Sequence, residues 1–134
     1  MSISLMWFRN DLRVDNNDAL SHATQSGQPV VGIYLYCQKQ LELHREGNVK
    51  QDFLIQNLFA LEKKLQTLDI PLLVIKAYEF KNCSKEILTI ITKYDASHLF
   101  FNKEFGINEE KRDQEIIALL AKEKIEVKTY SDQV

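Results

Sequence analysis

Short apolar runs alternate with longer amphipathic stretches along the chain. Five of these runs are too short for a helix and are rich in β-branched and aromatic residues, which is typical of buried strands. They span residues 3–8, 30–36, 71–75, 97–101 and 126–130. The last run alternates apolar with polar residues, so it predicts a strand nearer the edge of the sheet.

The stretches between these runs show helical periodicity. Five leucines step by four, three, four and three residues, which predicts one face of a long helix; they are Leu54, Leu58, Leu61, Leu65 and Leu68. Shorter helices are predicted after residues 15–18, which offer several N-cap candidates, and over residues 83–94 and 108–122. The polar stretch over residues 39–48 is predicted to be a connecting loop.

Strands that alternate with helices predict βαβ units, and therefore a parallel sheet covered on both faces. The expected fold class is α/β, a Rossmann-like three-layer domain with a five-stranded parallel sheet and helices on both faces. Ligands of such sheets bind at the carboxyl ends of the strands. The loops over residues 9–15, 37–49 and 102–108 are therefore the expected positions of a site.

Length and composition indicate the number of domains and the expected cellular location. The 134 residues fit one domain, and 45% of them are hydrophobic and 27% charged, as in ordinary globular proteins. No apolar run approaches the length of a membrane span and the start lacks the features of a signal peptide, so a cytoplasmic location without membrane association is expected. Cys37 and Cys83 form no metal-ligand spacing and suggest no disulfide framework.

The charge pattern argues against DNA binding by this domain alone. The formal net charge is −2, and lysines and arginines are interleaved with acidic residues. A domain that holds DNA by itself usually presents a basic face. If the protein acts on DNA, the contacts are expected elsewhere.

Several familiar sites are absent from the sequence. The loop after the first strand, Arg9-Asn10-Asp11-Leu12-Arg13, contains no glycine, whereas dinucleotide sites need glycines there for the backbone to approach a pyrophosphate. Its alternating charges suggest pairing across a tight loop, with a structural role favoured for Arg9 and Asp11. His22 is predicted to face solvent and His98 to be structural. A dehydrogenase, a kinase and a GTPase are all disfavoured.

One stretch resembles a known family. Residues 5–20 resemble the opening of the photolyase/cryptochrome family, whose pattern is W-F-R-x-D-L-R followed by D-N and A-L. The matching residues are Trp7, Phe8, Arg9, Asp11, Leu12, Arg13, Asp15, Asn16, Ala19 and Leu20. One more residue stands before Ala-Leu than is usual, so that Asn16-Asn17 is an equivalent match to the D-N pair.

A second stretch, residues 99–113, resembles the folate-type photolyases, in which an Asn-Glu pair contacts the antenna chromophore 5,10-methenyltetrahydrofolate. The resemblance carries these contacts to Asn108 and Glu109. An amide and a carboxylate suit the edge of a pterin ring, because both accept hydrogen bonds from ring N–H groups. The same residues also suit the cap and first turn of a helix, and that alternative stays open.

Other positions agree with the family less specifically. His44 falls in the loop after the second strand, where folate-binding relatives place a histidine against the chromophore. Lys50-Gln51 stands where the family often has Arg-Gln, which keeps the charge but loses the bidentate guanidinium. Arg112-Asp113 also matches the family, although an ion pair on a helix face explains it adequately.

The resemblance implies that residues 1–134 are the amino-terminal antenna domain of a deoxyribodipyrimidine photolyase, which repairs cyclobutane pyrimidine dimers with light. The FAD-binding helical domain, absent from this chain, is then its partner, damaged DNA binds only to the full-length protein, and the fragment alone is inactive. The end of the chain directly after the fifth strand is expected to be a cut. The alternatives are a cryptochrome, a stand-alone nucleotide-binding module, and a photolyase with a deazaflavin or flavin antenna.

Overall fold

Five strands alternate with four helices in the computed structural model, which describes residues 2–9, 11–37, 47–77, 83–104 and 107–131. The strands are β1 (Ile3–Phe8), β2 (Val30–Cys37), β3 (Leu72–Ala77), β4 (Ala96–Asn102) and β5 (Glu126–Tyr130). The helices are α1 (Asp18–Thr24), α3 (Gly47–Gln66), α4 (Cys83–Tyr94) and α5 (Ile107–Lys122). No helix in these ranges is long and apolar enough to cross a membrane.

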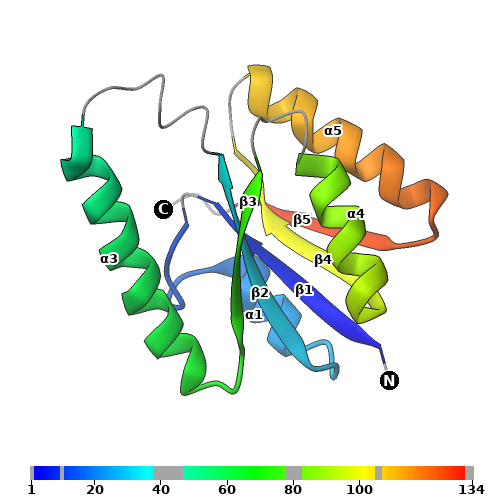
Figure 1. Cartoon of the computed structure of the whole chain (residues 1–134). Helices are drawn as coiled ribbons and strands as arrows, with labels where there is room; N and C mark the ends of the chain where they lie inside the picture. The colour runs from blue at the N-terminus through cyan, green and yellow to red at the C-terminus, as the bar shows by residue number, and fades with distance from the viewer. Residues whose placement is uncertain (1, 10, 38–46, 78–82, 105–106, 132–134) are drawn as a thin grey trace.

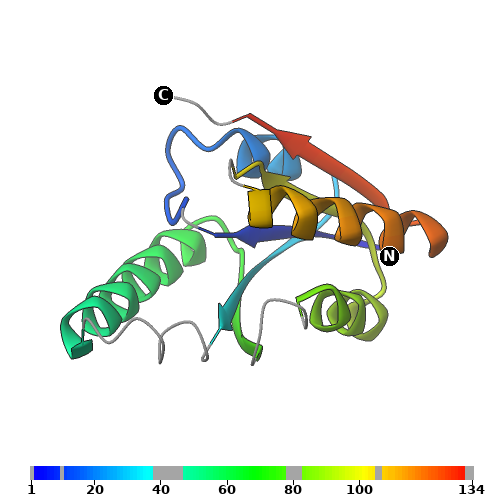
Figure 2. The same ribbon diagram turned by 90° about the horizontal axis from the view of Figure 1, so that it is seen from above.

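All neighbouring strands pair in parallel, in the order β3-β2-β1-β4-β5. The chain therefore builds outward from β1 to β3 on one side and then returns to place β4 and β5 on the other. The order reverses between β1 and β4, which makes their carboxyl ends the switch point of the sheet. Helices α1 and α3 lie on one face and helices α4 and α5 on the other (Figures 1 and 2). The predicted three-layer α/β fold is confirmed, with β5 at an edge.

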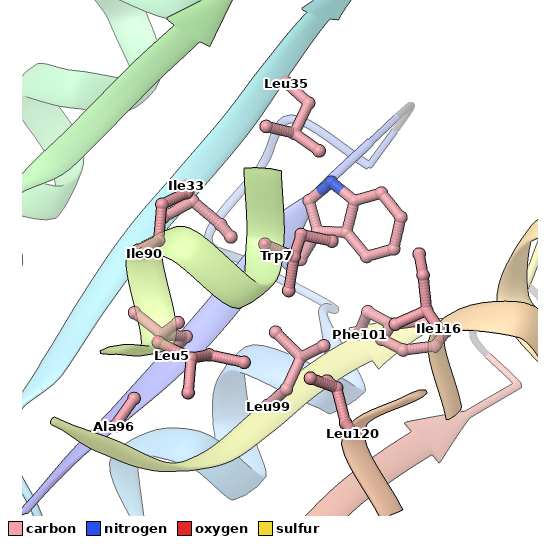
Figure 3. Packing of buried hydrophobic residues seen from close by; sticks show 12 residues of the cluster. Leu5, Trp7, Ile33, Leu35, Ile90, Ala96, Leu99, Phe101, Ile116 and Leu120 are labelled. Carbon is pink, nitrogen blue, oxygen red and sulfur yellow. The ribbon is translucent and has the colours of Figure 1, made fainter. Parts of the chain in front are cut away.

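The pleat of β1 divides its side chains between two cores. Leu5 and Trp7 point toward α4 and α5, whereas Met6 and Phe8 point toward α1 and α3. All four are at most 2% exposed, because helices cover both faces of a parallel sheet. Figure 3 shows the first of these cores, in which strand residues pack against isoleucines and leucines of α4 and α5.

The long helix differs from its prediction at both ends. Helix α3 begins at Gly47, inside the stretch predicted to be a loop, and ends at Gln66. Leu68 therefore lies beyond the helix and is 50% exposed, so its predicted place in the buried stripe is wrong. The chain turns at Asp69, which has a positive φ of 59°, and Ile70 fills the core position instead.

Among the four candidates for the cap of α1, the structure selects Asn17. Its side-chain Oδ1 accepts a hydrogen bond from the backbone nitrogen of Leu20 at 3.1 Å. The preceding residue, Asn16, has a positive φ of 52°, which asparagine tolerates better than most residues. This local turn brings the cap to the carboxyl end of β1.

Candidate functional site

The switch point between β1 and β4 is filled by buried charged side chains. The guanidinium of Arg9, which directly follows β1, donates from Nη1 to Asp113 Oδ1 at 2.6 Å and lies 3.2 Å from Glu104 Oε1 through Nε. Its Nη2 donates to the backbone carbonyl of Asn102 at the end of β4. The side chains of Arg9 and Asp113 are only 5% and 9% exposed. Arg9 thus ties β1, β4 and α5 together.

A second guanidinium lies beside the first. Arg112 donates to Glu104 Oε1 at 2.8 Å, so Glu104 receives both arginines. The guanidinium carbons of Arg9 and Arg112 stand 4.8 and 5.2 Å from the centre of the Trp7 ring. Such cation–π contacts are strongest where water is excluded, and Trp7 is 2% exposed. The Trp7 ring and the carboxylates of Glu104 and Asp113 therefore all stabilise the two guanidinium charges.

The same cluster shifts the titration of Asp113. Burial raises the pKa of its carboxyl above the ordinary value of 3.8, and the neighbouring Arg9 opposes that rise without cancelling it. The raised pKa means that burial of the negative charge costs more than its attraction to the arginines returns. Asp113 is accordingly a group whose charge depends on the neighbouring guanidiniums.

Asn102 is the centre of a second layer of the network, in which amide groups bind the Asp11 carboxylate and the start of α1. Its Nδ2 donates to Asp11 Oδ2 at 2.6 Å and to Asn17 Oδ1 at 2.8 Å, while its Oδ1 accepts from the backbone nitrogen of Ala19 at 3.1 Å. The other carboxylate oxygen of Asp11 accepts from the backbone nitrogen of Arg9 at 2.8 Å. The end of β4 is thereby bonded to the loop after β1 and to the start of α1.

These contacts agree with the structural role predicted for Arg9 and Asp11, but the partner of Arg9 differs from the prediction. The charges of Arg9 and Asp11 were expected to pair across the loop, but the Arg9 guanidinium reaches instead to Asp113 and Glu104. The two side chains point in different directions. Arg9 points to the face covered by α5, whereas Asp11 points back over the loop toward Asn102. The crevice that holds nucleotides in related sheets is therefore filled by the chain's own side chains.

Of the three predicted chromophore contacts, one side chain can be placed. Glu109 lies in the first turn of α5 and is partly buried. It makes no hydrogen bond or ion pair with any residue in the described ranges. Asn108 is the second residue of α5, but its side chain lies outside what the structure describes, and His44 falls wholly outside the described residues. Whether the three come together therefore stays a prediction.

Arg112 and Asp113 form a weaker pair than expected for a helix face. Their closest charged atoms are 3.6 Å apart, and each has a nearer partner, in Glu104 and Arg9 respectively. The role of Glu104 and Asn102 was missed, although both follow the apolar run of β4. Polar residues directly after a buried strand are a signal that could have found them.

A groove of about 860 Å³ lies between α5 and β5. Phe101, Ile117 and Thr129 are among its lining residues, together with the side chains of Lys103 and Lys111. Glu104, Asp113 and Glu110, the residue after Glu109, also line it, so the groove adjoins the buried ion network. Within the described residues, no three His, Cys, Asp or Glu side chains gather in an arrangement that could hold a metal ion.

Comparison with known proteins agrees with this architecture. A family model described as DNA photolyase matches residues 4–134. The deoxyribodipyrimidine photo-lyase of Buchnera aphidicola subsp. Acyrthosiphon pisum is 32% identical, over 100% of this chain and 28% of that protein. The chain therefore spans little more than a quarter of that relative's length.

Solved structures show the same fold. The cryptochrome of Synechocystis sp. PCC6803 matches with a TM-score of 0.86 at 26% identity, over 98% of this chain and 27% of that one. The archaeal photolyase of Sulfolobus tokodaii, solved with two FAD molecules, matches with a TM-score of 0.78 at 20% identity, over 96% of this chain and 29% of that one. At that identity the second likeness concerns the fold alone.

Proposed function

Because the chain belongs to the DNA photolyase family, we propose that it is the antenna-binding domain of a deoxyribodipyrimidine photolyase. In this proposal the domain holds 5,10-methenyltetrahydrofolate, which when bound supplies absorption of near-ultraviolet and blue light. The rest of the longer protein carries FAD, binds damaged DNA and splits cyclobutane pyrimidine dimers. The chain alone, which covers 28% of the Buchnera photo-lyase, repairs nothing.

The observation that carries the folate assignment is the carboxylate of Glu109. It is partly buried, and within the described residues no side chain or backbone group bonds to it. A carboxylate in that state accepts hydrogen bonds from a ligand that presents N–H groups, as the edge of a pterin ring does. Glu109 lies in the first turn of α5, where the partial positive charge of the helix amino end attracts a carboxylate.

The buried ion network supports the same assignment, because it fixes the backbone next to Glu109. Arg9 binds Asp113 in the second turn of α5. Arg112 binds Glu104, which lies in the segment before the helix. A contact residue is effective only where its own backbone is fixed. The network fixes the start of α5 against β1 and β4, and with it the position of Glu109.

The charge of this chain supports the proposal that DNA binds to another part of the longer protein. This chain has a formal net charge of −2, and a phosphate-binding surface needs clustered lysines and arginines. The guanidiniums of Arg9 and Arg112 are bonded to carboxylates of this chain. Damaged DNA is therefore proposed as a partner of the full-length protein only.

A cryptochrome is the second candidate function, and the likeness to the Synechocystis cryptochrome at 26% identity favours it. The two functions share this domain, so the antenna proposal holds for both. A stand-alone nucleotide-binding module is disfavoured, because the switch point is filled by Arg9, Asp113 and Asn102. A deazaflavin or flavin antenna is an alternative that the folate experiment below also addresses.

Binding of the chromophore can be followed through the single tryptophan. Trp7 lies against Arg9 and Arg112, in the network that joins β1 to α5, and its emission overlaps the absorption of methenyltetrahydrofolate. Titration of the chain with methenyltetrahydrofolate should quench that emission to saturation, and a titration with riboflavin should not. No quenching by either compound would contradict an antenna role for this domain alone.

Two neighbouring glutamates give a matched pair of variants. Glu109→Gln should weaken folate binding about 10-fold or more, since a hydrogen bond to a charged group contributes roughly 1.5–3 kcal/mol. Glu110→Gln removes the same charge from the next, exposed residue and should leave the affinity unchanged. Equal losses in both variants would show that general charge, rather than a contact by Glu109, governs binding.

A repair assay on the full-length protein distinguishes a photolyase from a cryptochrome. Sequencing the source gene past the codon for Val134 gives the complete reading frame. The product, loaded with FAD, should convert cyclobutane dimers to pyrimidines under blue light. If it binds FAD and folate but leaves the dimers intact, the cryptochrome assignment replaces the photolyase assignment.

A further inference from the structure

A second polar cluster lies at the amino end of the sheet, where the register between β1 and β4 changes. Ile3 pairs with Ala96, whereas Ser4 pairs with His98, so Ser97 is the extra residue of a β-bulge. Consecutive side chains of a regular strand point to opposite faces, and a bulge changes the direction of one of them. The bulge thereby places the Ser97 hydroxyl 2.7 Å from His98 Nδ1.

The other side of the imidazole faces a carboxylate. His98 lies opposite Glu126 in the β4–β5 ladder, and its Nε2 is 2.8 Å from Glu126 Oε2. Lys128, and to a lesser extent His98, hold the pKa of Glu126 below its usual value, so this carboxylate is ionised near neutral pH and only accepts hydrogen bonds. The proton of a neutral imidazole therefore sits on Nε2, which leaves Nδ1 as the acceptor of the Ser97 proton.

A side-chain amide completes the cluster. Gln28 Oε1 accepts a hydrogen bond from the fully buried Ser4 at 2.8 Å, which holds the amide 3.1 Å from the Ser97 hydroxyl oxygen. The single Ser97 proton points either to this oxygen or to His98 Nδ1, and rotation of the hydroxyl carries it from one acceptor to the other. Within the described residues, its NH₂ group has no hydrogen-bond partner. A glutamine N–H next to a nucleophile can stabilise the negative oxygen of a tetrahedral adduct.

We infer that Ser97 is an activated nucleophile that accepts acyl groups from small activated esters, independently of the antenna role. A hydroxyl within hydrogen-bond reach of an imidazole that is itself oriented by a carboxylate is the arrangement that nucleophilic catalysis requires. His98 and Glu126 side chains are 25% and 58% exposed, so the cluster is open to solvent. An open site without a deep pocket suits small acyl donors such as aryl acetates.

The chemical step balances within this cluster. Ser97 Oγ bonds to the ester carbonyl carbon while its proton passes to His98 Nδ1, and Glu126 stabilises the resulting imidazolium. Collapse of the tetrahedral adduct breaks the bond to the aryl oxygen, which takes the proton from the imidazolium and leaves as the phenol. The product is an ester of Ser97, and no oxidant or cofactor is needed.

The test uses the purified chain and p-nitrophenyl acetate. Release of p-nitrophenol should accompany addition of one acetyl group in intact mass, and peptide mapping should place that group on Ser97. His98→Gln should slow acetylation of Ser97 by about 100-fold or more, the usual contribution of a general base. Glu126→Gln should slow it less, and Ser21→Ala, which removes an exposed serine of α1, should leave the rate unchanged.

A second variant separates reactivity from folding. Ser97→Cys keeps a nucleophile beside His98 and should react with iodoacetamide faster than a cysteine placed by Ser21→Cys. Acetylation confined to lysines, or a Ser97 rate that is the same in wild type and His98→Gln, would overturn the inference. Because folate is absent from the assay, that result would leave the antenna proposal standing.

Discussion

The two ends of the sheet carry similar chemical groups in opposite surroundings. At the carboxyl end, the paired side chains of Arg9 and Asp113 are 5% and 9% exposed, whereas at the amino end those of His98 and Glu126 are 25% and 58% exposed. A buried ion pair that loses one partner leaves an uncompensated charge, while an exposed pair contributes little to stability. The comparison therefore predicts that the carboxyl end controls folding and the amino end does not.

The largest effect is expected from Arg9. The substitution Arg9→Met leaves Asp113 buried without its nearest cation, and should lower the free energy of unfolding by about 3–5 kcal/mol. Lys103→Met, which removes an exposed cation just after β4, should change it by about 0.5 kcal/mol or less. Urea denaturation followed by circular dichroism measures both. Equal losses would mean that burial does not distinguish the two cations.

A smaller loss is expected from the layer of the network around Asn102. Asn102→Ala removes one hydrogen bond to the Asp11 carboxylate and the hydrogen bond from the backbone nitrogen of Ala19, which should cost about 1–3 kcal/mol. At the opposite end of the sheet, Ser97→Ala should cost about 0.5 kcal/mol or less. A larger loss from Ser97→Ala than from Asn102→Ala would reverse the comparison.

The pH dependence of stability gives the smallest but most specific effect. The pKa of Asp113 is raised in the folded protein, so the folded state binds this proton more tightly than the unfolded state. The difference in unfolding free energy between wild type and Asp113→Asn should therefore fall as the pH rises from about 3.8 through the raised pKa. Its slope is at most about 1.4 kcal/mol per pH unit, because one proton is involved. A difference that increases with pH over this range would show that the arginines outweigh burial.

Most of the architecture could be predicted because it depends on short-range patterns. Apolar runs such as Ile3–Phe8 and the leucine spacing of α3 report burial over a few residues, and every predicted strand is present. Leu68 was misplaced because periodicity does not show where a helix ends. The turn at Asp69 decides that, and it lets Ile70 take the core position.

The site was harder to predict because its contacts join distant parts of the chain. Arg9 and Asp113 are 104 positions apart, and nothing in either segment specifies the other. Sequence patterns identified the right strand ends but assigned Arg9 a partner within its own loop. The proposed reactivity of Ser97 depends on a single bulge, which the apolar pattern of β4 does not reveal.

The most direct test of this account is a backbone-amide NMR titration of the 134-residue chain with methenyltetrahydrofolate. The account predicts that chemical-shift changes concentrate at the start of α5 around Glu109, while the signals of Ser97, His98 and Glu126 stay unchanged. Shifts centred on the amino end of the sheet would contradict the placement of the chromophore.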